Sequence, residues 1–295
     1  MRLKHCHNFH DFRKLAKQRL PSPIFDYIDG AADDELTCRR NSRSFEECDL
    51  VPNVLKGVSH IDMSVTVMGQ KLQMPLFCSP TALQRLFHHE GERATAGAAA
   101  KFGTMFGVSS LGTVSLEELR KIYNTPQVYQ FYFHKDRALN QVMMERAKAA
   151  GVDVMMLTVD SITGGNRERD LRNGFSIPFR LTLSGMLQFA FKPMWGINYV
   201  THESFKLPQL DDHVEMSGGA LSIGRYFTEM LEPSMNWDDV AEMVKLWDGQ
   251  FCLKGVMSVE DVKKAIDIGC TGVVLSNHGG RQLDGSRSPD RKSVV

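Results

Sequence analysis

Short apolar runs that finish on polar or reactive side chains recur along this chain, and they predict its fold. Each run is rich in Val, Leu, Met or Phe, as is typical of strands buried on both faces. The stretches between them have helical character, and Ser115 and Ser258, each followed by acidic residues, predict capped helix starts. The apolar runs are 74–78, 104–108, 127–129, 154–157, 251–253 and 273–275, and the helical stretches are 91–102, 115–123, 136–150 and 258–268.

Two further helices are predicted before the first run. Asn8 is a suitable cap for a helix that reaches Leu20, where Pro21 stops it. A second, short helix spans Ile24 to Ile28 and ends at Gly30.

Alternation of strands and helices predicts parallel strands joined by right-handed crossovers. Polar groups gathered at the ends of parallel strands fit a TIM (β/α)8 barrel, whose active site lies at that face. A doubly wound sheet also binds ligands at strand ends, but no Gly-x-Gly-x-x-Gly opens the first helix. We therefore predict one α/β domain over 1–295, of the barrel type, with about six βα units visible.

The stretch 161–249 is too long for an ordinary connection between the fourth and fifth strands. Within it, 177–200 is rich in Phe, Leu, Met and Trp but is interrupted by Arg180, Lys192 and Pro193. This insertion fits either a lid packed on the barrel or a segment that dips into a membrane surface.

Charge, cysteine spacing and the N-terminal segment argue against nucleic-acid binding, a disulfide framework, a metal site and a signal peptide. The 295 residues carry 35 acidic and 35 basic side chains, so nothing favours nucleic acid as a partner. The six cysteines form no Cys-x-x-Cys pair, which predicts reduced thiols in a cytoplasmic setting. His5, Cys6, His7 and His10 have no partner cluster, so no metal site is expected. The N-terminus lacks the apolar core of a signal peptide.

The most informative stretch is 272–284. It begins as a buried strand and ends in the string Ser-Asn-His-Gly-Gly-Arg-Gln-Leu-Asp. His278 could accept a proton near neutral pH. Arg281 could hold a carboxylate through two parallel hydrogen bonds. A surface turn with an incidental His and Arg is the alternative, but a base beside an anion site suits chemistry at the carbon next to a carboxylate.

The whole string resembles the signature of the FMN-dependent 2-hydroxy acid dehydrogenases and oxidases, which include lactate dehydrogenase, mandelate dehydrogenase and glycolate oxidase. A second string, from Leu20-Pro21 through Phe25-Asp26-Tyr27 to Asp33-Asp34-Glu35, resembles the N-terminal segment of the same family. Together the similarity covers residues 8 to 286.

The resemblance implies a role for each matching residue. His278 would be the base, oriented by Asp160, and would take a proton from the substrate hydroxyl or from its α-carbon. Arg281 and Tyr27 would hold the carboxylate, with Tyr132 near the substrate oxygen and Arg167 as a second cation. The residues expected to contact FMN are Pro80, Thr81, Ala82, Ser109, Gln130, Thr158 and Lys254, the last beside the flavin's N1 and O2, where a fixed cation would stabilise negative charge. Leu111 stands where glycolate oxidases carry a bulky aromatic, which favours lactate or a larger acid.

The family continues with a Gly-rich stretch and a later Gly-Arg pair that bind the FMN phosphate, whereas this sequence after Gly285 is polar. The sequence therefore predicts a barrel that is incomplete at its C-terminus and weak in phosphate donors.

We expect an FMN-dependent L-2-hydroxy acid dehydrogenase, with L-lactate as substrate and a quinone or cytochrome as electron acceptor. The alternatives are an L-mandelate dehydrogenase, a hydroxy acid oxidase, and an inactive barrel fragment that serves as an interaction module. The resemblance further implies a homotetramer and, through the insertion, peripheral contact with the cytoplasmic face of the inner membrane.

Overall fold

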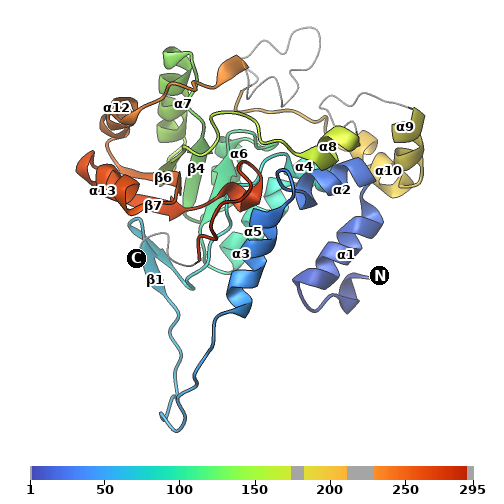
Figure 1. Cartoon of the computed structure of the whole chain (residues 1–295), viewed down its shortest axis with the longest axis horizontal. Coiled ribbons are helices and arrows are strands. Elements are labelled where there is room, and N and C mark those ends of the chain that lie inside the picture. Colours follow the sequence, from blue (N-terminus) through green and yellow to red (C-terminus); the bar gives the residue numbers. More distant parts are fainter. Residues whose placement is uncertain (1, 174–182, 211–228, 291–295) are drawn as a thin grey trace.

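A single parallel sheet forms the centre of the molecule (Figure 1). A computed structural model describes residues 2–173, 183–210 and 229–290. In these ranges five strands lie side by side in sequence order, which is the order of strands in a (β/α)8 barrel and differs from that of a doubly wound sheet. The strands are β3 (Phe106–Ser109), β4 (Gln127–Phe131), β5 (Val154–Thr158), β6 (Gln250–Val256) and β7 (Gly272–Leu275). The predicted parallel α/β fold is confirmed.

Four of the helices that precede or connect these strands begin close to where the sequence predicts, whereas α12 lies in the long stretch 161–249, for which no helix was predicted. Ser115 and Ser258 accept hydrogen bonds from the backbone N–H groups of Glu118 and Asp261, so both predicted caps are confirmed. Such caps are readable in a sequence because they depend on local side-chain-to-backbone contacts. These helices are α5 (Glu92–Lys101), α6 (Leu116–Ile122), α7 (Arg137–Ala149), α12 (Trp237–Trp247) and α13 (Val259–Asp267).

The first predicted strand, 74–78, is wrong in its extent. Only Cys78 pairs with the sheet, through one parallel bridge to Phe106 at the edge of β3. Pro75 and Pro80 carry no N–H group, so they cannot donate to a ladder of hydrogen bonds on either side of Cys78.

A hairpin that the sequence analysis missed packs near the amino ends of the strands. It consists of β1 (Val65–Val67) and β2 (Gln70–Leu72), which pair antiparallel. Met68 and Gly69 form its turn with φ values of 46° and 72°, and two-residue turns with positive φ match the twist of a hairpin. Its apolar side chains cover a second core cluster made of Leu72, Met105, Val128, Val154, Met156 and Cys252.

The N-terminal segment folds into α1 (Phe9–Arg19), α2 (Ser22–Asp29) and α3 (Leu36–Glu46). The Asn8 side chain accepts a hydrogen bond from the Asp11 N–H at 3.0 Å, so the predicted cap is confirmed. The second predicted helix is present as α2, which brings Tyr27 onto the sheet side of the segment, where it is buried.

The long connection from β5 to β6 holds several helices. α8 (Glu168–Arg172), α9 (Leu183–Ala190) and α10 (Pro193–Thr201) lie at the same side of the molecule as α1 and α2 (Figure 1). α12 packs against α7 and β6 and therefore serves as the crossover helix. Residues 174–182 and 211–228 of the predicted insertion lie outside the described residues. No helix in the described ranges combines the length and the apolar character that crossing a membrane requires.

Candidate active site

A cavity of about 410 Å³ opens at the carboxyl ends of the strands. This is the face at which α/β barrels carry their ligand sites. The predicted site residues that line it are Tyr27, Pro80, Thr81, Ala82, Ser109, Gln130, Tyr132, Arg167, Lys254, His278 and Arg281. The other two predicted residues stand directly behind this wall, since Asp160 contacts His278 and Thr158 contacts Gln130. The structure thus brings all thirteen together.

His278 and Asp160 form a close pair beside the cavity. The His278 Nδ1 lies 2.7 Å from Asp160 Oδ1 and 3.3 Å from the Lys254 ammonium. Burial lowers the pKa of His278 more than the hydrogen bond to Asp160 raises it, and the Lys254 charge adds to the lowering. The imidazole is therefore neutral at neutral pH and able to accept a proton.

Asp160 is held as an anion. Burial alone would raise the pKa of this carboxyl, but the hydrogen bond with His278 and the charge of the nearby Lys254 ammonium lower it below its ordinary value. The carboxylate also accepts a hydrogen bond from Ser161 Oγ at 2.9 Å. Gly255 permits this close arrangement, since its φ is +108° and a Cβ there would lie 2.6 Å from the Asp160 Cβ.

The backbone of His278 is itself unusual. Its φ is +56°, in the left-handed region that non-glycine residues rarely occupy. Its N–H donates to Ser276 Oγ at 3.0 Å, and the Asn277 side chain accepts from the Gly280 N–H. These bonds offset the strained conformation, which turns the imidazole from the end of β7 toward Asp160.

Two guanidinium groups face the same part of the cavity. The Cζ atoms of Arg281 and Arg167 lie 5.2 Å and 5.1 Å from the centroid of the Tyr27 ring. Arg281 donates to the Gly30 carbonyl at 2.5 Å. Burial is the main cause that lowers the pKa of Arg281, and the positive charge of the nearby Arg167 lowers it further. An anion placed between them would relieve this repulsion, so the arrangement suits a carboxylate.

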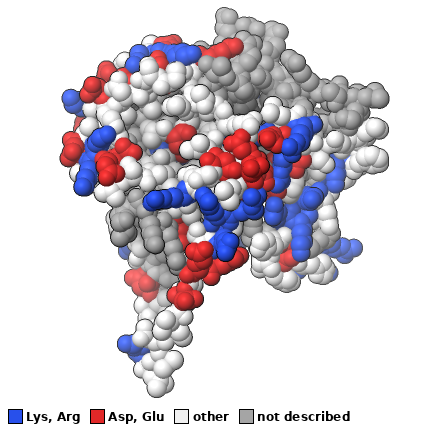
Figure 2. All heavy atoms as spheres, viewed as in Figure 1, with Lys and Arg blue, Asp and Glu red and all other residues white. Residues whose placement is uncertain are grey.

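Ion pairs between α1, α2 and α8 fix the segment that carries Tyr27 and Gly30. Asp29 binds Arg13 at 2.5 Å and Arg169 at 3.1 Å, and Arg169 also pairs with Glu35. Figure 2 shows acidic and basic side chains interleaved on this side of the molecule. A linked network of this kind holds its members more firmly than isolated surface pairs do.

The residues predicted to contact FMN form a polar row across three strand ends. Ser109 Oγ donates to the Gln130 amide oxygen at 3.1 Å, and the Gln130 amide nitrogen donates to Thr158 Oγ1 at 2.8 Å. Lys254 follows on the next strand, and burial lowers its pKa. Alternating donors and acceptors beside a buried cation fit the polar edge of a flavin ring, so the residues present are compatible with FMN.

Sequence reasoning missed several residues that support the site. Ser161 bonds Asp160 and lies 3.3 Å from His278 Nδ1, and its position next to Asp160 was the available signal. Asp284, the last residue of the recognised string, instead accepts hydrogen bonds from the Leu36 and Thr37 N–H groups at the start of α3. No local sequence pattern predicts a helix cap that comes from a residue about 250 positions away.

An α/β barrel-type sheet with a buried histidine–carboxylate pair, two guanidinium groups and a flavin-compatible polar row at its strand ends fits a flavin-dependent oxidoreductase. The model of the FMN-dependent dehydrogenase family matches residues 16–291, and the chain belongs to that family. It is 38% identical over 283 residues to an L-lactate oxidase of Nostoc, covering 95% of this chain and 72% of the relative. It is 35% identical over 286 residues to an L-lactate dehydrogenase of Pectobacterium atrosepticum, covering 93% and 71%.

Among solved structures, a monotopic membrane protein, (S)-mandelate dehydrogenase, is similar with a TM-score of 0.89 and 33% identity. The match covers 97% of this chain and 76% of that one. The chain spans between 66% and 74% of the length of the curated relatives it matches. The predicted barrel type and family are therefore confirmed, whereas the roles of single residues and the phosphate site stay predictions.

Proposed function

We propose that this chain serves the FMN-dependent oxidation of an L-2-hydroxy acid, with L-lactate converted to pyruvate and the electrons passed to a quinone or cytochrome. One observation carries the proposal. A neutral imidazole paired with a carboxylate at 2.7 Å lies in the same cavity as two guanidinium groups and a buried lysine. Base, anion site and cofactor cation are the three parts that this reaction needs.

The substrate carboxylate binds between Arg281 and Arg167, with Tyr27 and Tyr132 as neighbouring hydroxyl groups. This contact fixes the orientation of the α-carbon relative to the base. Burial raises the pKa of Tyr132, so its phenol stays protonated and can donate to a substrate oxygen.

His278 accepts a proton from the bound acid. The proton comes from the hydroxyl or from the α-carbon, and a neutral imidazole suits both routes. FMN, held by the residues of the polar row and Lys254, would supply the two-electron acceptor, and the substrate's second hydrogen would leave with these electrons as a hydride (if His278 takes the hydroxyl proton) or as the hydroxyl proton (if His278 takes the α-proton). The Asp160 carboxylate stabilises the imidazolium that forms, as in other His–carboxylate pairs.

Leu111 supports lactate or a larger acid over glycolate. Its side chain is buried and lines the cavity, on the wall formed after β3. An aliphatic residue at this place leaves space beyond a hydrogen atom on the α-carbon. L-Mandelate is the second substrate candidate, favoured by the similarity to (S)-mandelate dehydrogenase. Direct use of oxygen is favoured by the similarity to the Nostoc oxidase.

The test is anaerobic mixing of the FMN-loaded protein with L-lactate, L-mandelate and glycolate while the flavin absorbance is followed. The proposal expects rapid bleaching with L-lactate, slower bleaching with L-mandelate and the slowest with glycolate. Peroxide release in air at the rate of substrate oxidation would favour the oxidase. Retention of full flavin absorbance with all three acids would contradict the proposed activity.

We further propose that α9 and α10 bind a membrane surface peripherally. Phe191, in the turn between the two helices, and Met194 and Val200, on α10, are 79%, 67% and 80% exposed, so large apolar side chains lie here without cover from the described residues. Exposed apolar area of this kind partitions into the boundary between headgroups and acyl chains.

Flotation with anionic phospholipid vesicles tests this contact. The double variant Phe191→Ser with Val200→Ser is expected to stay at the bottom of the gradient while the wild type floats. Phe102→Ser, which removes an exposed aromatic at the end of α5, is the matched control and should float. If the double variant floats as well as the wild type, α9 and α10 are not the segment that binds the membrane.

A further inference from the structure

The loop 110–113, between β3 and α6, determines where one wall of the cavity stands. Leu111 is its cavity-lining residue. The Leu111 carbonyl accepts from the Leu83 N–H at 3.0 Å, and the Leu111 N–H donates to Ser109 Oγ at 3.2 Å. Any shift of the loop therefore moves Leu111 relative to the substrate site.

A buried carboxylate holds the far end of this loop. Glu92, the first residue of α5, is fully buried, and it accepts from the Thr113 N–H at 2.8 Å and from the Thr113 hydroxyl at 2.5 Å. Burial raises the pKa of Glu92. Two hydrogen bonds from one residue to one carboxylate fix both the backbone and the side chain of Thr113.

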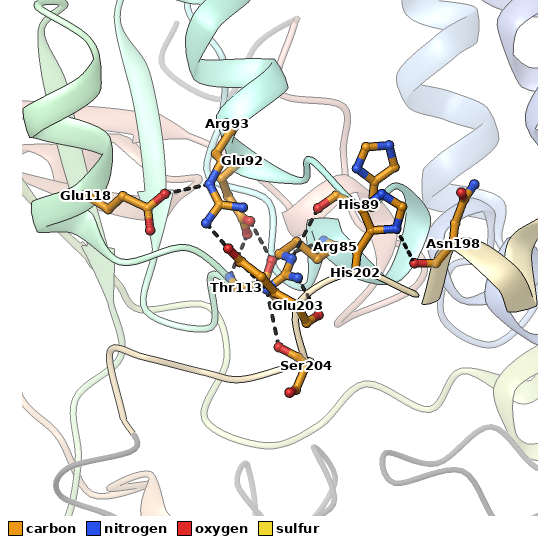
Figure 3. Close-up of polar contacts among 10 residues, drawn as sticks. All are labelled: Arg85, His89, Glu92, Arg93, Thr113, Glu118, Asn198, His202, Glu203 and Ser204. Atoms are coloured by element: carbon orange, nitrogen blue, oxygen red, sulfur yellow. Dashed lines mark hydrogen bonds and ion pairs between the residues drawn. The ribbon is translucent and has the colours of Figure 1, made fainter. Parts of the chain in front are cut away.

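Arg85 connects the loop to the segment that follows α10 (Figure 3). It lies on α4 (Gln84–Phe87), and its side chain is only 7% exposed. The Arg85 backbone N–H donates to Thr113 Oγ1 at 3.1 Å. Its guanidinium donates to the carbonyls of Ser204 at 3.3 Å and Glu203, and pairs with the Glu203 carboxylate at 3.3 Å.

The shape around Arg85 leaves little freedom to this side chain. Its Nε donates to the His89 carbonyl at 3.2 Å. Gly91 has a φ of +51°, and a Cβ there would lie 2.4 Å from the Arg85 Cγ. A guanidinium that donates to three carbonyls from a nearly closed position is a fixed connection and not a mobile surface group.

Gln209 holds the residues that flank the same loop. Its amide nitrogen donates to the Ser109 carbonyl at 3.2 Å and to the Val114 carbonyl at 3.0 Å. The side chain is 1% exposed. The segment 203–210 thus contacts both ends of the loop that carries Leu111, through Gln209 directly and through Arg85.

We propose that Arg85, with Gln209, is a positioning residue that sets the size of the 2-hydroxy acid side chain the cavity accepts. It acts through Leu111 and makes the segment after α10 part of the specificity wall. The inference rests on the proposed oxidation of a 2-hydroxy acid. An apolar wall discriminates one methylene by about tenfold or more only when it cannot yield, so the connections behind Leu111 matter as much as Leu111 itself.

Arg85→Ala tests the inference through the ratio of kcat/KM for L-lactate to kcat/KM for L-mandelate. The variant keeps the backbone N–H that donates to Thr113 but loses the guanidinium contacts to the segment 203–204, so α4 and the loop bonded to it are no longer fixed to that segment. The ratio is expected to shift about tenfold toward L-mandelate, because a wall that can yield accepts the larger side chain. The kcat for L-lactate should stay within about threefold of wild type, since the base and the anion site are untouched. A general loss of stability would lower kcat for both acids and leave the ratio in place.

Arg93→Ala is the matched control. Arg93 binds the same Glu203 carboxylate at 3.0 Å, but its other partner is Glu118 on α6 instead of the loop 110–113. It is expected to keep the wild-type ratio. In a Leu111→Ala background, Arg85→Ala should change the ratio by less than about twofold, because the two residues act in series.

Three results would overturn the inference: an unchanged ratio in Arg85→Ala, an equal shift in Arg93→Ala, or full additivity with Leu111→Ala. If Arg85→Ala does not fold, the same ratio of kcat/KM values is measured in Gln209→Leu, for which the same shift is expected. An unchanged ratio in that variant overturns the inference.

A wild-type protein that oxidises neither acid would contradict the proposed function separately. The ratio is then measured as dissociation constants of pyruvate and phenylglyoxylate by calorimetry. A shift in Arg85→Ala that is lacking in Arg93→Ala still supports the positioning role, and equal ratios oppose it.

Discussion

His134 and His278 both follow parallel strands, β4 and β7, and burial lowers the pKa of both, yet their surroundings differ. The His134 ring lies 3.1 Å from the Asn140 amide oxygen and is fully buried, with its pKa lowered to about 4. His278 pairs with the Asp160 carboxylate and lines a cavity that also holds Arg281. An amide partner leaves a buried histidine as a neutral packing residue, whereas a carboxylate and an open cavity equip it to take and hold a proton.

The largest expected effect separates these two histidines directly. His278→Gln should lower kcat for L-lactate by about 10⁴-fold, the upper range for loss of a general base, while FMN binding is retained. His134→Gln should change kcat by less than about threefold at pH 7.5. Steady-state rates with an artificial electron acceptor check both variants. Comparable losses in the two variants would mean that burial, and not the partner, makes the difference.

Asp160→Asn sharpens the comparison because it gives His278 an amide partner like that of His134. Loss of the carboxylate removes the charge that stabilises the imidazolium, and kcat should fall by about 10²- to 10³-fold. The KM for L-lactate should change much less, since Arg281 and Arg167 remain. Retention of wild-type kcat would show that the carboxylate is dispensable.

The pH dependence of kcat/KM gives a further distinction. His278 must be neutral to accept a proton, and its pKa lies below the ordinary 6.5, so activity should be level above that pH. Below the lowered pKa it should fall by about tenfold per pH unit. If kcat/KM already decreases with falling pH well above pH 6.5, the His278 pKa is raised instead.

His134 should affect the pH dependence of the unfolding free energy. Its folded-state pKa lies below the unfolded value, so the unfolded chain binds the additional proton as the pH falls from about 6.5 toward 4. The stability that the neutral ring provides is complete above 6.5 and is lost across this window. Between pH 7.5 and pH 5 the wild type should lose roughly 2 kcal/mol more unfolding free energy than His134→Gln in urea titrations. Parallel pH profiles for both proteins would exclude the shift.

The smallest expected effect concerns a polar residue of the same turn as His278 that lies outside the cavity. The backbone N–H groups of Thr37 and Leu36 hold the Asp284 pKa at about 2, against the opposing effect of burial. Asp284→Ala should lower the unfolding free energy by about 1 kcal/mol, as for loss of a helix cap, with little change in kcat. A large loss of turnover in a folded variant would assign this residue to the reaction.

The parts of the molecule that the sequence predicts are those specified locally. Asn8, Ser115 and Ser258 cap helices through contacts within four residues, and strand runs are visible because buried strands are continuously apolar. The hairpin turn at Met68 and Gly69 left a weaker signal, since its strands have three residues each.

The parts that the sequence could not predict depend on tertiary contact. Asp284 caps α3, which lies near the other end of the sequence. The Arg85 guanidinium donates to the Ser204 carbonyl, more than a hundred residues further along the sequence. For the site itself, local patterns show which residues end the strands, and only the fold shows that Asp160 stands 2.7 Å from His278. The resemblance supplied this pairing in advance, whereas spacing alone did not.

The central claim is that His278 takes the proton that allows the hydroxy acid to be oxidised. The most direct measurement is the anaerobic rate of flavin bleaching by L-lactate in wild type and in His278→Gln, both loaded with FMN to the same absorbance. The account predicts rapid bleaching in the wild type and a rate about 10⁴-fold lower in the variant. Bleaching of the variant at the wild-type rate would contradict it.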